Sequence, residues 1–307
     1  MQSKVFVVVL NFNGWRDSAA CLSSLRQLHY DNYEIVVVDN GSTDDSVARI
    51  RSQYSCLRLI EAGKNLGFAG GCNLGIRQAL AHSAEFIWLL NNDTIADPGS
   101  LQALVDSARC ESRIGAVGSA IYCMHERDNL QAWGGGQVNF WLGRSGHFLK
   151  PVQRHKIEFI TGASMLISRE VLESIGFLDE GFFMYWEDAD FCFRLRQAKW
   201  KLAVAEGSKV WHKASASVGP NSARMDAYFN ASARRFFGKH ARVPTVPVFV
   251  GGSLRLLKRI AHGEWERARA VWAGMTLKSG GREWDPGGTP VQPTPSESDM
   301  CQKPVQY

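Results

Sequence analysis

Three carboxylates stand within four residues of one another at the expected start of a helix. Glu187, Asp188 and Asp190 open a segment that we expect to be helical to about Ala198, and the positive end of a helix dipole favours ionised carboxylates there. Asp190 lies four residues before Arg194, so these two side chains are expected to pair along the helix. Glu187 and Asp188 are left for acid–base chemistry, in which a carboxylate takes a proton from a reacting hydroxyl. The alternative is that the cluster is only a helix N-terminus with favourable electrostatics.

A second candidate site follows an apolar run. Residues 86–90 read Phe-Ile-Trp-Leu-Leu and lead directly into Asn91, Asn92 and Asp93. Open α/β sheets bind their ligands at the carboxyl ends of strands, so Asp93 is expected to bind a ligand. A carboxylate there can hold a divalent cation on a diphosphate. The alternative is that these residues merely form a turn before Pro98.

The elements that must position these groups alternate between strand and helix. Strands are predicted at residues 4–10, 34–38, 57–61 and 86–90. Helices are expected between them, the second one capped by Ser42 or Thr43. This order specifies a mostly parallel sheet with helices on both faces. The loops after the strands would bring one polar residue each to a common crevice: Asn11, Asp39, Asn65 and Asp93.

Nucleotide chemistry fits such a crevice best. The glycines between Gly63 and Gly71 do not follow the G-x-G-x-x-G pattern of dinucleotide-binding proteins, and there is no G-x-x-x-x-G-K-[ST] phosphate loop. Asp39 can accept hydrogen bonds from an imide or a ribose hydroxyl. The sequence therefore favours a nucleotide with a metal-bound diphosphate over a nicotinamide cofactor.

Composition bounds the class of protein. With 307 residues, 45% of them hydrophobic and 21% charged, the chain is expected to form one large globular domain or two closely joined ones. No stretch approaches the roughly 20 apolar residues that cross a bilayer, and no signal peptide is recognisable, so a cytoplasmic protein is expected. The seven cysteines show no C-x-x-C pair and no regular spacing, which argues against a zinc site or a disulfide framework.

Several stretches resemble the successive motifs of family 2 inverting glycosyltransferases of the GT-A fold. The resemblance covers residues 4 to about 217. It is carried by Val7–Trp15, Val36–Asp45, Asn65–Asn73, Trp88–Thr94, Thr161–Ile167, Gly176–Arg194 and Val210–His212.

The resemblance implies a donor half that binds a nucleotide sugar. It assigns the pyrimidine of the nucleotide to Asp39, with Asn11 beside it. The other expected donor-binding residues are Asn13, Asn40, Asn65, Gly67, Asn73, Asn92 and Asp93. The acidic D-x-D element of the family corresponds to residues 91–93, of which only Asp93 keeps a carboxylate. Asp93 and His212 are thus the expected ligands of a divalent cation, Mg²⁺ or Mn²⁺; alternatively, His212 is a packed histidine at a strand end.

The resemblance also assigns the chemistry. In relatives the aspartate of the Glu-Asp pair is the base, which carries over to Asp188, with Glu187 as the next candidate. Tyr185, Trp186 and Trp133 are expected to contact the acceptor sugar, the alternative being aromatic core packing. Gly162 is expected to help shape the floor of the donor site.

The expected organisation has three parts. Residues 1–217 form the GT-A domain, with a nucleotide-sugar half (about 1–115) and an acceptor and catalytic half (about 116–217). Residues 218–279 form a basic helical segment, with helices expected at 223–239 and 251–275, the latter interrupted at His262, and residues 280–307 form a disordered tail. Between Arg224 and Asp285 there are twelve Lys and Arg but five Asp and Glu.

Among relatives, the motif before Asp190 is most similar to that of bacterial rhamnosyltransferases. The resemblance implies transfer of L-rhamnose from dTDP-L-rhamnose to a saccharide, commonly a lipid-linked one, in the synthesis of O-antigen or other cell-envelope glycans. The alternatives are a family member using a UDP-sugar and a carbohydrate-binding protein without catalysis. No nucleic-acid partner is expected.

The C-terminal segment also suggests where the protein works. Apolar and basic residues are interleaved there, as in helices that lie in the headgroup layer of anionic membranes. The apolar set is Phe236, Phe237, Val248, Phe249, Val250, Leu254, Leu256, Leu257, Ile260, Trp265 and Trp272, and the basic set is Arg234, Arg235, Lys239, Arg255, Lys258, Arg259, Arg267 and Arg269. We therefore expect peripheral attachment to the cytoplasmic face of the inner membrane, weakened by salt. The alternative is that the apolar residues pack these helices against the catalytic domain.

Overall fold

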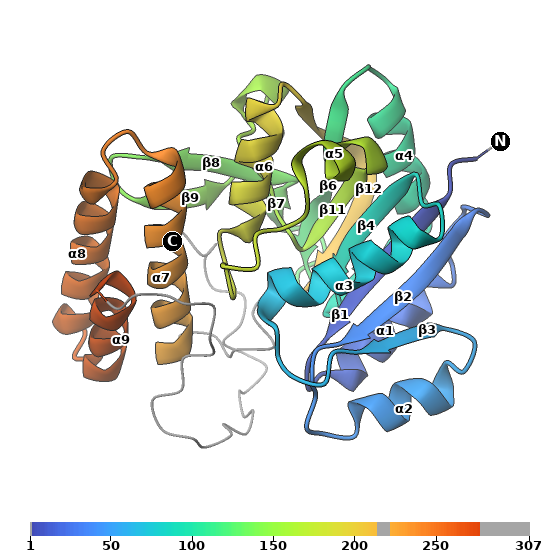
Figure 1. The fold of residues 1–307 in the computed structure, drawn as a ribbon, viewed down its shortest axis with the longest axis horizontal. Coiled ribbons are helices and arrows are strands. Elements are labelled where there is room, and N and C mark those ends of the chain that lie inside the picture. Colours follow the sequence, from blue (N-terminus) through green and yellow to red (C-terminus); the bar gives the residue numbers. More distant parts are fainter. Residues whose placement is uncertain (1, 214–221, 277–307) are drawn as a thin grey trace.

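A nine-stranded sheet forms the centre of the molecule (Figure 1). The computed structural model describes residues 2–213 and 222–276. The strands lie in the order β3-β2-β1-β4-β11-β6-β12-β5, and β7 pairs with β6. Their bounds are β1 Val5–Asn11, β2 Tyr33–Asp39, β3 Arg58–Glu61, β4 Phe86–Asn91, β5 Thr94–Ala96, β6 Ile114–Cys123, β7 Leu130–Trp133, β11 Ser164–Ser168 and β12 Lys201–His212.

The first four predicted strands are parallel neighbours, as expected. In the register of β1 and β2, Asn11 lies opposite Asp39. The second half departs from a parallel sheet, because β11 runs antiparallel to both β4 and β6. A separate three-stranded sheet has the order β10-β8-β9 and comprises β8 Gly135–Asn139, β9 Arg144–His147 and β10 Phe159–Ile160.

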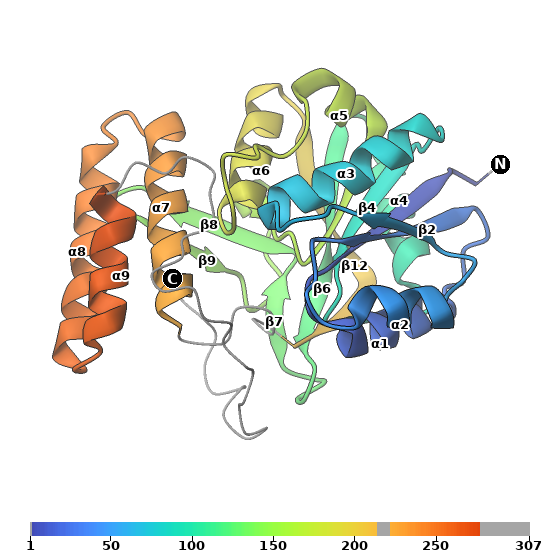
Figure 2. The same ribbon diagram turned by 60° about the horizontal axis from the view of Figure 1, so that its bottom comes forward.

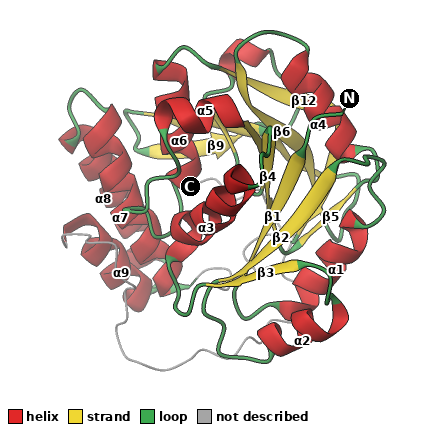
Figure 3. Ribbon diagram, turned by 45° about the vertical axis from the view of Figure 1, so that its right-hand side comes forward, coloured by secondary structure: helices red, strands yellow, loops and turns green. Residues whose placement is uncertain are grey.

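Helices cover both faces of the large sheet (Figure 3). Alternate side chains of β1 point to opposite faces: Phe6 and Val8 pack in one core with α3, α5, α6 and α7, and Val5, Val7 and Val9 pack in the other with α1, α2 and α4. The helices are α1 Trp15–Leu25, α2 Ser46–Gln53, α3 Gly67–Ala81, α4 Ser100–Arg109, α5 Arg169–Ile175, α6 Glu187–Gln197, α7 Ala223–His240, α8 Thr245–Ala261 and α9 Trp265–Thr276, with a 3₁₀ turn at Arg154–Lys156.

Two local expectations were wrong. Neither Ser42 nor Thr43 caps a helix, because α2 begins three residues later, after Asp45. The hydroxyl of Ser42 bonds to Asp39 instead. The helix expected from residue 251 begins earlier, at Thr245. Pro247 does not prevent this, because it falls within the first turn, where no helix hydrogen bond needs its missing amide hydrogen.

Helices α7, α8 and α9 form a bundle beside the part of the molecule that contains the large sheet (Figures 1 and 2). The expected break after α8 is present, with Gly263 in the left-handed region. Phe236 and Phe237 on α7 are wholly buried, so they belong to the core and not to a membrane-facing surface. Helix α7 therefore shares one hydrophobic core with the sheet.

Three further expectations concerned membrane-spanning segments, cysteines and the C-terminal tail. Within the described residues, no helix has both the length and the apolar character to span a bilayer. Within the described residues, no two cysteines are joined by a disulfide. The tail expected to be disordered, residues 280–307, lies outside the described residues.

The buried aromatic face of α7 should be important for stability. Truncating a wholly buried phenylalanine leaves a cavity, so we expect Phe236→Ala to lower the free energy of unfolding by about 3–5 kcal/mol. Denaturant titration measures this change. The matched control is Phe249→Ala on α8, whose side chain is 69% exposed and whose loss should change stability by no more than about 0.5 kcal/mol. Equal losses in both variants would contradict the role given to α7.

Candidate functional site

The ends of β1 and β2 hold a buried carboxylate in one orientation. Asn11 Nδ2 donates to Asp39 Oδ1 over 2.8 Å, and the hydroxyl and backbone amide of Ser42 donate to its two oxygens over 2.6 and 2.9 Å. Asp39 is 2% exposed and Asn11 is fully buried. A carboxylate has about four acceptor positions, so Asp39 retains acceptor capacity for a ligand. Its side chain is preorganised for that role.

Asn13 ties the first loop to the second. Its backbone is in the left-handed region, with φ of 50°, and its Oδ1 accepts from the amide of Thr43 over 2.8 Å. Its own amide donates to the Ser42 hydroxyl over 2.9 Å. Asparagine tolerates this conformation better than most residues. The expected donor-binding residues Asn11, Asn13 and Asp39 are therefore brought together at one edge of the sheet.

Two other expected donor residues hold loops in place. Asn40 is 3% exposed and bonds to Asn65 Oδ1, the Gly67 carbonyl and the Leu66 amide. Asn73 is 1% exposed, and both of its amide hydrogens are engaged, by the Leu178 carbonyl and Glu180 Oε1. Since their donor groups are already engaged, Asn40 and Asn73 act as positioning residues in this arrangement.

Gly67 allows the chain to pass close to the segment that precedes α6. Its φ is +73°, and a Cβ atom at this position would lie 2.2 Å from the carbonyl oxygen of Phe183. The neighbouring amide of Phe68 donates to that same oxygen over 2.7 Å. The start of α3 is therefore fastened to the segment that precedes α6, and only glycine fits.

Asp93 and His212 meet, although they are more than one hundred residues apart. The antiparallel pairing of β5 with β12 places His212 opposite Thr94, so that His212 Nε2 lies 3.3 Å from Asp93 Oδ1. The other ring nitrogen, Nδ1, lies 2.7 Å from Gln131 Oε1. The Gln131 amide oxygen accepts a hydrogen bond from Nδ1, which leaves Nε2 as the acceptor nitrogen; Nε2 lies 3.2 Å from Asn91 Nδ2 as well as close to Asp93 Oδ1. Metal binding by His212 therefore stays a prediction, and so does the alternative that it is a packed histidine at a strand end.

These two side chains fit a divalent cation with few protein ligands. A carboxylate oxygen and an imidazole nitrogen are suitable donors for Mn²⁺, and an amide that orients the histidine is typical of metal sites. Within the described residues there is no group of three or more His, Cys, Asp or Glu side chains that could hold a metal. The other ligands would therefore come from a diphosphate and from water.

Asn92, which precedes Asp93, has a structural contact instead. Its Nδ2 donates to the Ser18 hydroxyl over 3.0 Å.

Backbone amides hold Asp188 at the start of α6. Its Oδ2 accepts from the amide of Gly162 over 2.9 Å and its Oδ1 from the amide of Ala189 over 2.7 Å. Burial raises the pKa of this partly exposed carboxyl, and the two amides oppose the rise by stabilising the ionised form. A carboxylate with a raised pKa is a better proton acceptor than an ordinary aspartate.

Glu187 points into the protein interior. It is 6% exposed, and its Oε2 has no hydrogen-bond partner among the described residues. Burial, and after it repulsion by Asp188, hold the pKa of Glu187 well above the usual range for glutamate. Both causes favour the protonated, neutral form of Glu187 over the ionised form.

Asp190 is the structural member of the cluster, as expected. It is fully buried and pairs with Arg194 over 2.9 Å, with His240 over 2.8 Å and with Lys239 over 2.5 Å. Burial by itself would raise the pKa of Asp190, but the hydrogen bonds from His240, Lys239 and Arg194 lower it to about 2. This ionised carboxylate joins α6 to the end of α7.

The aromatic residues expected at the acceptor site divide into two groups. Trp186 is 3% exposed and packs against Phe229, Phe236 and Phe237, with ring centroids 4.8–5.5 Å apart. Its position is that of a core residue, and the acceptor-binding expectation for it was wrong because α7 covers it. Trp133 is 7% exposed at the end of β7, which also leaves little of its ring to offer a sugar. Tyr185 is only partly buried and keeps the expected role.

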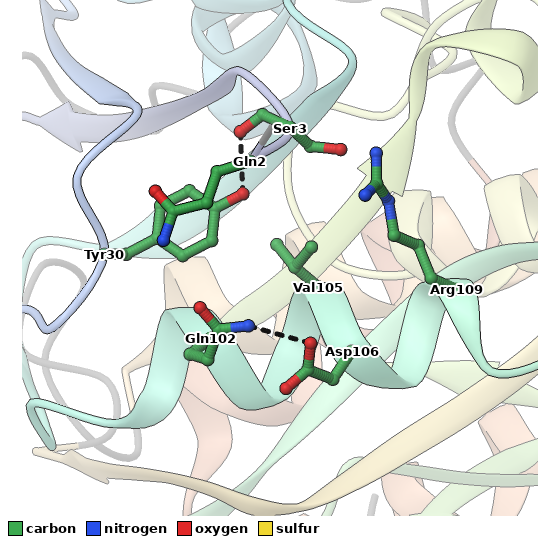
Figure 4. A pocket seen from close by; sticks show the side chains of 7 residues that line it. All are labelled: Gln2, Ser3, Tyr30, Gln102, Val105, Asp106 and Arg109. Carbon is green, nitrogen blue, oxygen red and sulfur yellow. Dashed lines mark hydrogen bonds between the residues drawn. The ribbon is translucent and has the colours of Figure 1, made fainter.

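A surface cavity of about 330 Å³ lies away from all of these residues (Figure 4). It is lined by Gln2, Ser3, Tyr30, Gln102, Val105, Asp106 and Arg109. These residues come from the region before β1, from the loop between α1 and β2, and from α4, at the opposite end of β1 from Asn11. The cavity contains none of the expected site residues, so it is not the candidate site.

Comparison with known proteins identifies the family. A family model described as Glycosyl transferase family 2 matches residues 6–176, more than half of the chain. The chain belongs to glycosyl transferase family 2. This family 2 protein is a glycosyltransferase and has the GT-A fold, so both expectations are confirmed.

Two relatives illustrate the similarity in sequence. The N-acetylglucosaminyl-diphospho-decaprenol L-rhamnosyltransferase of Mycobacterium tuberculosis is 29% identical over 213 residues, covering 62% of this chain and 69% of that protein. The low-salt glycan biosynthesis hexosyltransferase Agl10 of Haloferax volcanii is 28% identical over 210 residues, covering 64% of this chain and 63% of that protein.

Two solved structures show the shared fold. The mannosyltransferase PcManGT from Pyrobaculum calidifontis, in complex with GDP-Man and Mn²⁺, superposes with a TM-score of 0.59 at 18% identity, covering 90% of this chain and 76% of that one. GalNAc-T7 with UDP, GalNAc and Mn²⁺ gives a TM-score of 0.66 at 15% identity, covering 90% and 56%. Both of these complexes contain Mn²⁺, which is consistent with the divalent cation that we expect.

The structure adds two residues that the sequence did not single out. Gln131 orients His212, and Ser18 holds Asn92. It also shows a contact of Gly162 that was not expected, because the amide of Gly162 holds Asp188. Gln131 lies in a short strand without a motif, and its role depends on how β7 and β12 flank β6.

Because Asp188 and Glu187 have different environments, we expect substitution of Asp188 to impair turnover and substitution of Glu187 to leave it largely intact. Asp188→Asn keeps the shape but removes the proton acceptor, so kcat should fall about 10²-fold or more while donor affinity stays nearly unchanged. In the wild type, Asp188 must be ionised to act, so activity should fall as the pH drops through a pKa above the ordinary value of about 4. Initial rates against pH, with donor titration, measure both.

Glu187→Gln is the matched control. Glutamine has the shape of a neutral glutamic acid, so this variant should keep most of the kcat. Near-normal turnover by Asp188→Asn, combined with a collapse in Glu187→Gln, would transfer the role of base to Glu187.

Proposed function

We propose that this family 2 enzyme is an inverting, metal-dependent transferase that moves L-rhamnose from dTDP-L-rhamnose to a lipid-linked saccharide. The product would serve the synthesis of bacterial cell-envelope polysaccharide. The observation that carries the proposal is Asp188: a carboxylate with a raised pKa, held by two backbone amides at a helix N-terminus, in a glycosyltransferase.

Asp188 would act as the base of a single displacement. Its carboxylate takes the proton from the acceptor hydroxyl as that oxygen forms a bond to the anomeric carbon of the donor sugar. The bond between that carbon and the diphosphate oxygen breaks on the opposite face, and the nucleoside diphosphate leaves with the electron pair. The configuration at the anomeric carbon is thereby inverted.

The donor half would hold the nucleotide at the ends of β1, β2 and β4. Asp39, oriented by Asn11 and Ser42, can accept hydrogen bonds from the imide or ribose of the nucleotide. Asp93 and His212 would hold a divalent cation, Mg²⁺ or Mn²⁺. When bound, this cation neutralises negative charge on the departing diphosphate.

The identity of the sugar rests on the relatives. The mycobacterial protein is named as a rhamnosyltransferase whose acceptor is N-acetylglucosaminyl-diphospho-decaprenol, a lipid-linked saccharide. The alternative is a UDP-sugar, as in the GalNAc-T7 complex with UDP. A carbohydrate-binding protein without catalysis is a weaker alternative, because the chain keeps Asp93 together with Glu187 and Asp188.

The chemistry of the acceptor also suggests where in the cell the enzyme acts. A lipid-linked saccharide lies in a membrane, and nucleotide sugars are made in the cytoplasm. We propose that the enzyme attaches peripherally to the cytoplasmic face of the inner membrane. In this proposal residues 1–217 are the catalytic domain and residues 218–279 contribute to attachment, although α7 also belongs to the catalytic core.

The donor preference can be tested directly. We expect dTDP-L-rhamnose, with Mn²⁺ or Mg²⁺, to raise the melting temperature more than UDP-sugars or GDP-mannose do, because a ligand that binds only the folded state stabilises it. The same donor should support transfer to a diphospholipid-linked N-acetylglucosamine acceptor. Stabilisation and transfer with a UDP-sugar alone would show the alternative donor to be correct.

Dependence on the metal should require Asp93. Asp93→Ala removes the single carboxylate of the site, so most activity and the stimulation by Mn²⁺ or Mg²⁺ should both be lost. Asp128→Ala, at an exposed position, is the control and should behave as the wild type. Full activity of the wild type in excess chelator would remove the metal from the proposed mechanism.

A further inference from the structure

The outward side of α8 is apolar along its whole length. Phe249, Leu254 and Leu257 are 69%, 53% and 61% exposed. We call the outward side of this helix the α8 face; it comprises Val246, Phe249, Val250, Ser253, Leu254, Leu257, Ile260 and Ala261, all partly or fully exposed. These positions recur every three or four residues and so form one stripe. In Figures 1 and 2, α8 lies on the side of the bundle away from the large sheet.

The arginines of α8 point the other way, into the bundle. Arg255 Nε donates to Asn230 Oδ1 over 2.8 Å and its NH1 to the Gly143 carbonyl over 2.9 Å. Arg259 pairs with Asp226 over 3.0 Å. Helix α8 is thus fastened to the protein through its polar side and exposes its apolar side, the reverse of a surface helix in water. Of the basic residues of α8 in the set given above, Arg255 and Arg259 face the bundle and Lys258 is exposed.

Exposed apolar side chains gather in this part of the molecule. Within the described residues, the large hydrophobic side chains that stand exposed all come from the β8–β9 hairpin region or from residues 243–272: Trp141, Leu149, Val243, Phe249, Leu254, Leu257, Ile260, Trp265 and Trp272. The hairpin touches α8, since a Cβ atom on Gly143 would lie 1.9 Å from the Pro247 carbonyl oxygen. Such a concentration marks an interaction surface.

Three tryptophans and a set of cations accompany the α8 face. Trp141, Trp265 and Trp272 are 77%, 62% and 58% exposed, and tryptophan prefers the interface between lipid and water. In residues 141–150 and 242–276 the exposed charged residues are Arg144, Lys150, Arg242, Lys258 and Arg269, against Glu266 alone. This charge complements anionic lipid headgroups. A second copy docked by a two-fold axis would instead bring like charges together.

We propose that the α8 face and its three tryptophans insert into the boundary between headgroups and acyl chains of an anionic bilayer. This inference rests on the proposed function, because a lipid-linked acceptor requires the enzyme at that boundary. A helix of 17 residues is about 25 Å long and lies in the plane of the membrane. Since the arginines of α8 are engaged inside the protein, apolar contacts dominate, and attachment resists salt.

Vesicle sedimentation tests the surface. The full-length protein is mixed with phosphatidylglycerol–phosphatidylcholine vesicles, and the bound fraction is measured at about 0.1 M and about 1 M NaCl, where charge effects are largely screened. We expect most of the bound protein to stay bound at high salt. The triple variant Phe249→Ser, Leu254→Ser and Leu257→Ser should lose at least about 10-fold in partitioning, because three large apolar side chains no longer enter the lipid.

The matched control is the double variant Arg242→Gln and Lys258→Gln, which alters exposed charges and keeps the α8 face. It should lose binding mainly at low salt. Binding that vanishes in high salt, or that the triple variant keeps, would overturn the proposal. If the wild type forms dimers that the triple variant dissolves, as measured by light scattering, and neither protein binds vesicles, the α8 face is a self-association surface.

A second measurement separates this inference from the proposed function. Transfer to a short-chain, water-soluble diphosphosaccharide acceptor needs no membrane, so the triple variant should retain the wild-type rate on it. Absence of any rhamnosyl transfer by the wild type, alongside normal vesicle binding, would refute the proposed donor and acceptor but leave the membrane surface intact. A triple variant that binds vesicles and transfers normally would refute the surface alone.

Discussion

The catalytic end of the molecule depends on a turn that the chain would not adopt by itself. Tyr185 and Trp186 both have left-handed backbone conformations, with φ of 68° and 67°, and bulky residues in this region are strained by about 1–3 kcal/mol each. Trp186 is held there by Phe229, Phe236 and Phe237 of α7, and the Ser232 hydroxyl of α7 donates to the Met184 carbonyl over 2.8 Å. Because the next residues are Glu187 and Asp188, α7 fixes the direction of both carboxyls.

Three neighbouring carboxyls consequently have three different chemical states. Burial without a counter-charge raises the pKa of Glu187 well above its usual range, Asp188 is held by backbone amides and partly exposed, and cations lower the pKa of Asp190 to about 2. The differences arise from what each side chain faces, since the residue types are nearly the same. One proton acceptor among an acid and a structural ion pair is an arrangement suited to base catalysis.

Helix α7 also links the catalytic turn to the outer bundle. Asp226 on α7 accepts from Arg259 of α8 and from Arg267 of α9 over 3.0 and 2.7 Å, and Asn230 accepts from Arg255. These buried polar contacts draw Arg255 and Arg259 of α8 and Arg267 of α9 inward, and the aliphatic side chains on the far side of α8 remain outside. On one side, the same helix therefore supports the turn before Asp188, the proposed base, and on the other it sets which side of α8 is exposed.

The sequence by itself determined the local features. Apolar runs ending in Asn and Asp specified the parallel strands β1 to β4 and the edge at which Asn11, Asp39 and Asp93 gather, because the period of burial and the direction of parallel strands are local properties. It also identified Asp188 and the pairing of Asp190 with Arg194, four residues apart on a helix. Tertiary structure alone decided that Gln131 orients His212, that Trp186 is core, and that the arginines of α8 face inward. Each of these features depends on contacts between segments that are distant in sequence. The sequence of a helix with both apolar and basic residues does not show which of its sides the neighbouring helices cover, because that depends on how the helices pack together.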